Sequence, residues 1–195
     1  RYRMLETVRE YAREKLVAAG ETEAAQRRHL QWFLALAQQA AVGVRGSQQG
    51  EWLDRLELEH ENLRSALAWS LDDAEAQADA TQLGAALFWF WYLRGFTSEG
   101  RGWLEAILKR GPHCDFEEES RWYAHDTPRI REEAVALHRA RAEALLGAGV
   151  LAAFQDDYAV ARRYFDECIA IYQNIEDQRG LAYAAENRVV GLHVL

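Results

Sequence analysis

The chain has 195 residues, a formal net charge of −8 and a sequence pI of about 5.3. Its hydrophobic content of 49% argues against a disordered chain, and only two prolines interrupt a composition rich in good helix formers. Affinity for nucleic acid depends on Lys and Arg neutralising phosphates, so this acidic balance predicts no direct nucleic-acid partner.

The cysteines and the apolar runs predict where the chain resides. Cys114 and Cys168 are the only cysteines, and two isolated thiols in a helical chain indicate a reducing compartment rather than a disulfide framework. The apolar run at residues 83–93 is too short to span a bilayer, and no signal peptide opens the chain. We therefore expect a cytoplasmic protein without a membrane partner.

Two helices are expected first. Residues 4–19 have an apolar stripe at helical spacing, formed by Leu5, Val8, Ala12 and Leu16. Gly20 is expected to end this helix. A second helix is predicted at residues 22–41, and its inward positions are Leu30, Phe33, Leu34, Ala37 and Ala41. The glycine-bearing stretch at residues 43–50 is expected to connect it to the next helix.

The middle of the chain is rich in aromatic residues. A helical stretch is expected at residues 51–71, with a break near His60. Residues 82–94 then contain five consecutive aromatics, 88–92, which cover every side of a helix and must be contacted on several faces. We expect Phe90 and Trp91 to pack against neighbouring helices. Gly95 is predicted to end this helix, and a partner helix is expected at residues 98–109.

Residues 111–128 interrupt the helical pattern and are interpreted as an insertion. His113, Cys114, His125 and Asp126 could ligate a metal, but their spacing matches no zinc pattern, so we predict none. Thr127 and Pro128 are typical of a helix start. His60 has no partner at metalloprotease spacing and is expected to make a polar contact between helices.

The strongest pattern lies at residues 142–175. Leu145, Ala148 and Gly149 fall on a first helix, and Tyr158, Ala161, Phe165 and Cys168 fall on a second, after a turn at Asp156 and Asp157. Small residues stand where two helices must approach closely, and aromatics fill the space beside them. This spacing resembles the tetratricopeptide (TPR) helix-turn-helix. Residues 81–109 resemble a degenerate copy, and a further unit begins near Tyr183.

The resemblance implies an all-α fold: an antiparallel helix-hairpin array that forms a TPR-like right-handed superhelix. First helices of TPR hairpins line the concave face, where a peptide, a helix or a small ligand can bind. The residues that the TPR frame places on this face are Gln82, Trp89, Tyr92, Glu143, Phe154, Tyr183 and Glu186. Packing against neighbouring helices is the alternative role, and for Trp89 and Tyr92 the sequence favours neither.

The opening segment, residues 1–12, is similar to a recurring segment of large bacterial regulators. In them an ATPase module of the STAND (NB-ARC-like) class precedes a winged-helix domain. The similarity continues through residues 28–29, 52–57, 59–69, 93–95 and 99–104 and ends in the TPR at 149–165. It implies a helical linker at residues 1–72 and a TPR-like sensor array at 73–195, interrupted by the insertion.

The sequence contains no Gly-x-x-x-x-Gly-Lys-Ser/Thr phosphate loop, so we expect no cofactor in this part and place ATP and Mg²⁺ upstream. No nucleophile elbow or paired carboxylates predict catalysis, so no enzymatic activity is expected of the chain itself. The missing initiator Met and the apolar end suggest an internal piece of a longer protein.

Two functions from different classes remain. The first is a sensor region that binds a protein, a peptide or a small-molecule inducer and controls an upstream ATPase by intramolecular contact. Its parent would be a signal-responsive transcriptional regulator. The second is a stand-alone TPR adaptor that docks a helix or peptide of a partner protein.

Overall fold

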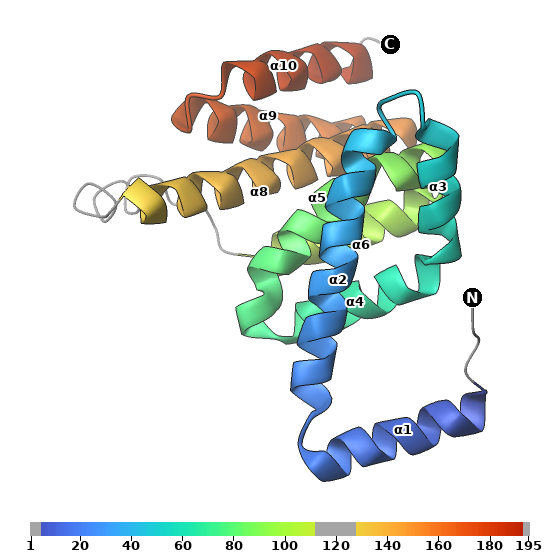
Figure 1. Cartoon of the computed structure of the whole chain (residues 1–195). Helices are drawn as coiled ribbons and strands as arrows, with labels where there is room; N and C mark the ends of the chain where they lie inside the picture. Colours follow the sequence, from blue (N-terminus) through green and yellow to red (C-terminus); the bar gives the residue numbers. More distant parts are fainter. Residues whose placement is uncertain (1–4, 112–127, 193–195) are drawn as a thin grey trace.

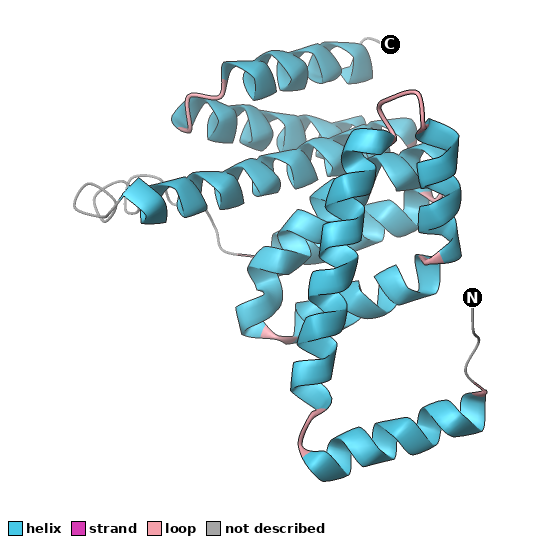
Figure 2. Cartoon of the chain, viewed as in Figure 1, coloured by secondary structure: helices cyan, strands magenta, loops and turns pink. Residues whose placement is uncertain are grey.

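The computed structural model describes residues 5–111 and 128–192, and within these ranges the chain is helical without any strand (Figure 2). The predicted all-α class is therefore confirmed. The elements are α1 (Glu6–Ala19), α2 (Thr22–Gly43), α3 (Gln49–Leu58), α4 (His60–Asp72), the 3-10 turn η1 (Ala74–Ala76), α5 (Gln77–Leu93), α6 (Thr97–Arg110), α8 (Pro128–Phe154), α9 (Tyr158–Asn174) and α10 (Gln178–Leu192).

The helix ends follow the local signals in the sequence. Gly20 ends α1 in the left-handed conformation, with φ of 69°, and its N–H donates to the Leu16 carbonyl. Gly95 adopts φ of 75° after α5. The expected break near His60 occurs at Glu59, between α3 and α4. Helix α5 begins earlier than predicted, because the Asp73 carboxylate accepts the Glu75 N–H at 2.9 Å and starts the turn that leads into it.

Consecutive helices pack as hairpins, and each hairpin packs on the next (Figure 1). Helix α5 pairs with α6, α8 pairs with α9, and α10 packs on α9 and, less extensively, on α8. Glycines permit the close approaches. A Cβ at Gly84 would lie 2.5 Å from the Ile107 side chain, and one at Gly149 would lie 2.8 Å from the Phe165 ring. The expectation that small residues and aromatics meet where these two helices approach is thus confirmed, and the pair that meets is Gly149 and Phe165.

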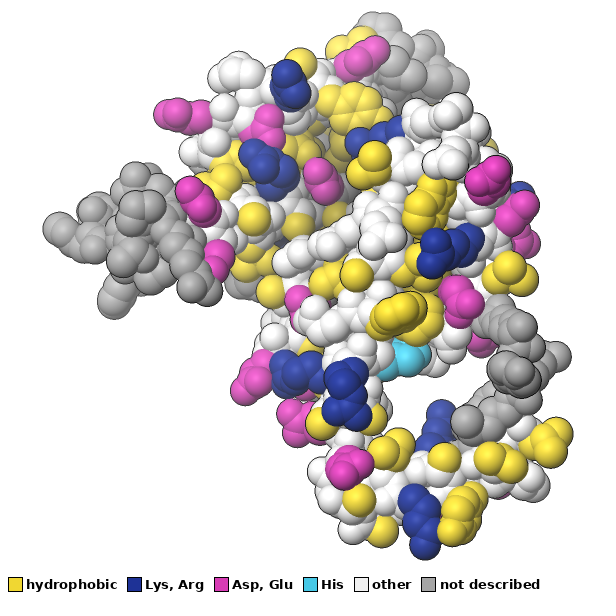
Figure 3. All heavy atoms as spheres, in the orientation of Figure 1, with side chains coloured by type: hydrophobic (Ala, Val, Ile, Leu, Met, Phe, Trp, Pro, Cys, Tyr) yellow, Lys and Arg dark blue, Asp and Glu magenta, His cyan; other side chains and the backbone are white. Residues whose placement is uncertain are grey.

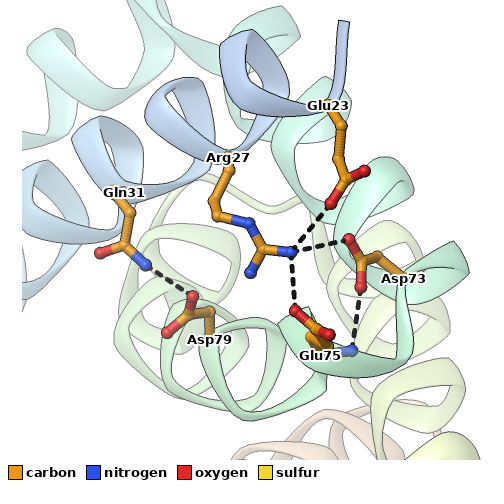
Figure 4. A network of polar contacts seen from close by, with 6 residues as sticks. All are labelled: Glu23, Arg27, Gln31, Asp73, Glu75 and Asp79. Atoms are coloured by element: carbon orange, nitrogen blue, oxygen red, sulfur yellow. Dashed lines mark hydrogen bonds and ion pairs between the residues drawn. The ribbon is translucent and has the colours of Figure 1, made fainter. Parts of the chain in front are cut away.

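Helix α2 lies across the front of α5 (Figure 1), and a polar network fastens its N-terminal half (Figure 4). Arg27 donates to the carboxylates of Glu23, Asp73 and Glu75, at 3.2 to 3.4 Å, and Gln31 donates to Asp79 at 2.6 Å. Desolvation raises the pKa of Asp79, and Arg27 and Gln31 oppose that rise. The network and one continuous core, from Leu30 to Ala184, cross the boundary predicted between residues 72 and 73.

The buried positions agree with the helical pattern. Leu30, Phe33, Leu34 and Ala37 of α2 are buried as predicted, while Ala41 is half-buried. Phe90 and Trp91 are each only 1% exposed, which confirms that they pack against neighbouring helices. No described helix combines the length and the apolar character that crossing a bilayer requires.

Helix α1 is the exception. It contacts the rest of the described structure mainly through α2, and hydrophobic side chains lie exposed along it at the bottom of the molecule (Figure 3). Leu5 is 73% exposed and Val8 is 48% exposed, so the apolar stripe is left largely uncovered. The insertion, with His113, Cys114, His125 and Asp126, lies mostly outside the described residues, as does the predicted cap Thr127.

Candidate functional site

A hollow of about 440 Å³ opens where the end of α2 meets the first helices of the successive hairpins. We call it the arginine–aromatic hollow. Its lining comprises Arg45, Ala85, Phe88, Trp89, Arg139, Glu143, Leu146, Tyr172, Asp177, Arg179, Gly180 and Tyr183. A volume of this size is in the range of small-molecule sites in proteins.

Helical spacing aligns the walls of the hollow. Arg139, Glu143 and Leu146 follow one another at i, i+4 and i+7 on α8, so they share one face. Arg179 and Tyr183 stand at i and i+4 on α10. Gly180 lets α10 approach α9, because a Cβ there would lie 2.3 Å from the Tyr172 ring.

Trp89 forms the wall contributed by α5. Its indole Nε1 is buried and has no hydrogen-bond partner among the described residues. The Arg45 guanidinium, from the segment after α2, lies 5.7 Å from the centroid of the Trp89 ring. A cation over an indole face is favourable, so this contact positions Arg45 above the hollow. Among the described residues the Arg45 guanidinium makes no ion pair.

The charges opposite Trp89 are partly compensated. Arg139 Nε donates to Asp177 Oδ2 at 2.9 Å, and Asp177 also accepts the Gly180 N–H at 3.0 Å. These hydrogen bonds lower the pKa of Asp177, that from Gly180 most strongly. Partial burial raises the pKa of the Glu143 carboxyl, while Arg45 and Arg139 oppose the rise and Asp177 adds to it. Glu143 nevertheless remains accessible to solvent.

The structure divides the seven residues predicted for the concave face. Trp89, Glu143 and Tyr183 line the hollow together. Tyr92 and Phe154 are not part of the lining; they form an aromatic pair with ring centroids 5.9 Å apart, and the Tyr92 ring also contacts that of Trp89, at 5.8 Å.

The remaining two predicted residues lie elsewhere. Gln82 faces α2, where its side-chain oxygen accepts a hydrogen bond from Gln38 at 3.1 Å. Glu186 is exposed on α10 and is not part of the hollow. Binding by any of the seven residues stays a prediction.

Sequence reasoning missed the arginines of the hollow. The i, i+4 pairs Arg139–Glu143 and Arg179–Tyr183 were a signal that each arginine shares a face with a predicted residue. Arg45 carried no such signal, because its place depends on how α2 lies across α5.

The remaining histidine and acidic clusters serve packing. His60 Nε2 lies 2.9 Å from Glu99 Oε1, and Arg64 also donates to Glu99, which joins α4 to α6. The predicted polar contact of His60 between helices is confirmed. Across residues 5–111 and 128–192 no three His, Cys, Asp or Glu side chains gather in a way that could hold a metal ion.

Of the comparisons with known proteins, only the one with curated proteins found relatives. No family model matches the chain, and no solved structure matches it. Three mycobacterial proteins do: one from Mycobacterium bovis and one each from the CDC 1551 and H37Rv strains of Mycobacterium tuberculosis. All are provisionally named HTH-type transcriptional regulators. Each is 38% identical over 109 residues, which is 56% of this chain but only 12% of the relative's length.

These relatives correct one prediction. The expectation of no direct nucleic-acid partner is wrong, because the similar proteins are named for the helix-turn-helix, a DNA-binding motif. The net charge of −8 was a poor guide to nucleic-acid binding, because it is the charge of these 195 residues alone. The part of the chain that matches the relatives covers only 12% of their length. Charge measured over one part of a chain does not constrain the partners of the whole.

Proposed function

We propose that the chain is the sensor region of a bacterial transcriptional regulator, and that binding in the arginine–aromatic hollow sets the regulator's activity. The similarity to the mycobacterial HTH-type regulators supports the parent class. The observation that carries the sensor role is the hollow itself, where α5, α8 and α10 converge on one accessible cavity. A surface shared by successive hairpins couples a ligand to the arrangement of the whole array.

The packing order supports a finer proposal. The pairing of α5 with α6 and of α8 with α9, followed by α10, agrees with the order of hairpins expected of a TPR-like array, and we propose α5, α8 and α10 as the first helices of three successive units. We further propose that this array belongs to a cytoplasmic STAND-type protein, in which a separate module holds ATP and Mg²⁺. In this arrangement α1 and α2 link the two parts, and the chain itself catalyses no reaction.

The test uses the full-length protein that contains this chain, with its target promoter fused to a reporter. The variant Trp89→Leu removes one wall of the hollow, and its matched control is Trp32→Leu, since Trp32 is 70% exposed on α2. We expect Trp89→Leu to change promoter output and ATP hydrolysis by about fivefold or more, the usual range of coupling between sites. Trp32→Leu should leave both unchanged.

Deletion of residues 81–195 provides the second arm. A full-length protein whose promoter output and ATPase rate ignored both this deletion and Trp89→Leu would contradict the sensor role. Circular dichroism of the two tryptophan variants establishes that both are folded before their activities are compared.

A further inference from the structure

We propose that the ligand of the arginine–aromatic hollow is a small planar aromatic anion, such as an arene carboxylate. This inference rests on the proposed sensor role and names the chemical class of the molecule sensed. The molecule would place its ring beside Trp89 and its negative group between Arg45 and Arg179.

The charges that line the hollow favour an anionic ligand. Three arginines and two carboxylates line the hollow, whereas the chain as a whole carries −8. One arginine, Arg139, is already paired with Asp177 at 2.9 Å. Within the described residues the guanidiniums of Arg45 and Arg179 make no ion pair, so two cationic groups face one unpaired carboxylate, Glu143. The hollow is thus a locally cationic spot on an acidic molecule, which attracts anions.

The Trp89 indole and the Arg45 guanidinium supply hydrogen-bond donors at the hollow. The buried Trp89 Nε1 has no acceptor among the described residues, and a buried donor without a partner costs free energy. An acceptor atom on a ligand would satisfy it once the side chains that cover Nε1 move aside. Arg45 presents further donors directly above the same ring, at 5.7 Å from its centroid. Indole and guanidinium together supply only donors, which favours a ligand with acceptor oxygens.

The size and aromatic lining of the hollow favour a planar ligand. Phe88, Trp89, Tyr172 and Tyr183 contribute aromatic side chains to the lining of the hollow. Planar rings stack on the faces of such side chains at little conformational cost. A hollow of about 440 Å³ accommodates a molecule of one or two fused rings.

The experiment titrates the 195-residue chain with three naphthalene probes of the same size and shape. These are 2-naphthoate, which is anionic, 2-naphthamide, which is neutral, and 2-naphthylmethylammonium, which is cationic. Isothermal titration calorimetry gives the dissociation constants. We expect 2-naphthoate to bind about tenfold more tightly than the amide, as charge-assisted contacts imply, and the cation to bind most weakly.

Variants then locate the anion. Arg45→Gln should weaken 2-naphthoate binding about fivefold or more without affecting the amide, because one charge-assisted contact is lost. Its control is Arg55→Gln, which removes an arginine that lies over another tryptophan, Trp52, at 5.2 Å. Glu143→Gln should tighten 2-naphthoate binding, since it removes the unpaired negative charge. These comparisons distinguish recognition of the ligand's charge from non-specific binding to aromatic surfaces.

NMR spectroscopy can follow the Trp89 indole N–H, the buried donor without a partner among the described residues. The ¹⁵N-labelled chain gives one indole N–H signal for each of its seven tryptophans, and Trp89→Phe identifies the signal of Trp89. That signal should move on addition of 2-naphthoate, while the signals of Trp32 and Trp52 stay in place. Absence of 2-naphthoate binding at millimolar concentration, or equal binding of all three probes, would overturn the proposal. In that event a reporter response to Trp89→Leu would still uphold the sensor role.

Discussion

At the scale of single residues, two of the contacts between helices depend on glycines, which have no side chain. Gly149 and Phe165 share one contact between α8 and α9, and Gly100 and Trp91 share another between α5 and α6. A Cβ at either glycine would lie within 3 Å of an aromatic ring, closer than van der Waals contact allows. Each aromatic ring occupies the space that a side chain at the glycine would fill, so the ring can be buried only if the glycine is kept.

The first prediction contrasts two helical glycines. Gly149→Ala should lower the free energy of unfolding by about 1 to 3 kcal/mol, because the added methyl group forces the Phe165 ring or a helix to move. Gly102→Ala on α6 should instead raise it by about 0.5 to 1 kcal/mol, since alanine favours a helix. A Cβ at Gly102 meets nothing within 4 Å. Urea unfolding measures both, and equal effects would contradict the packing described.

The second prediction concerns backbone strain after α9. Glu176 adopts φ of 56°, a left-handed conformation that costs a side-chain-bearing residue about 1 to 2 kcal/mol. Glu176→Gly should therefore raise the free energy of unfolding by about 0.5 kcal/mol, once the greater freedom of glycine in the unfolded chain is subtracted. Gln173→Gly within α9 serves as the control and should lower it by about 1 kcal/mol in the same urea series. A destabilised Glu176→Gly variant would refute the assignment of strain.

At the scale of elements, the turns between helices repeat one design. Asp157 precedes α9 and accepts the Val160 N–H, and Asp177 precedes α10 and accepts the Gly180 N–H. Each aspartate is also paired with an arginine of an earlier helix: Arg101 of α6 at 2.6 Å and Arg139 of α8 at 2.9 Å. One carboxylate thus caps the helix that begins and fastens it to the preceding hairpin.

The third prediction follows from this double role. Hydrogen bonds from Gly180 and Arg139 hold the pKa of Asp177 below its unfolded value, so the stabilisation is present above that value, about 3.9. It is lost as pH falls through the lower pKa of the folded state. Asp177→Ala should cost about 1 kcal/mol at pH 7, the usual cost of a lost cap.

Measurements at several pH values test whether the charge of the Asp177 carboxylate is responsible for this stabilisation. The difference between the wild-type chain and Asp177→Ala, measured by urea unfolding, should begin to shrink below about pH 4, where the carboxylate of the unfolded chain takes up a proton, and should be lost as the pH falls through the lower pKa of the folded state. A difference that stayed constant from pH 7 to pH 3 would show that the carboxylate charge has no part in fastening α10. Gln178→Ala, at the neighbouring exposed position, is the control.

At the scale of the whole molecule, stability is concentrated between α2 and α10. The core begins at Leu30 and ends at Ala184, whereas the described side chains of α1 are mostly exposed. The fourth prediction is that removal of residues 1–19 changes the free energy of unfolding by less than about 1 kcal/mol, since little apolar area is uncovered. Leu30→Ala, the control, should cost about 2 to 5 kcal/mol. A truncation as costly as Leu30→Ala would mean that α1 is integral to the core.

Local signals were sufficient for the helices and the close contacts between them. Gly20, Gly95 and the pairing of Gly149 with Phe165 could be predicted because each depends on neighbours a few turns away. The hollow could be predicted only in part. Trp89, Glu143 and Tyr183 were placed on one face by the expected repeat pattern and do line the hollow together, but Arg45 reaches them through the path of α2 across α5. No periodicity encodes a crossing between helices so far apart in sequence.

The course of α2 also has a mechanical consequence. Its 22 residues form one helix of about 33 Å, with Arg45 just beyond one end and the left-handed Gly20 just before the other. Such a helix is a stiff lever. A tilt of about 5° around one end would carry the other end through about 3 Å, given that length. A ligand that tilted α2 by drawing on Arg45 would therefore also move α1, on the opposite side of the molecule (Figure 1).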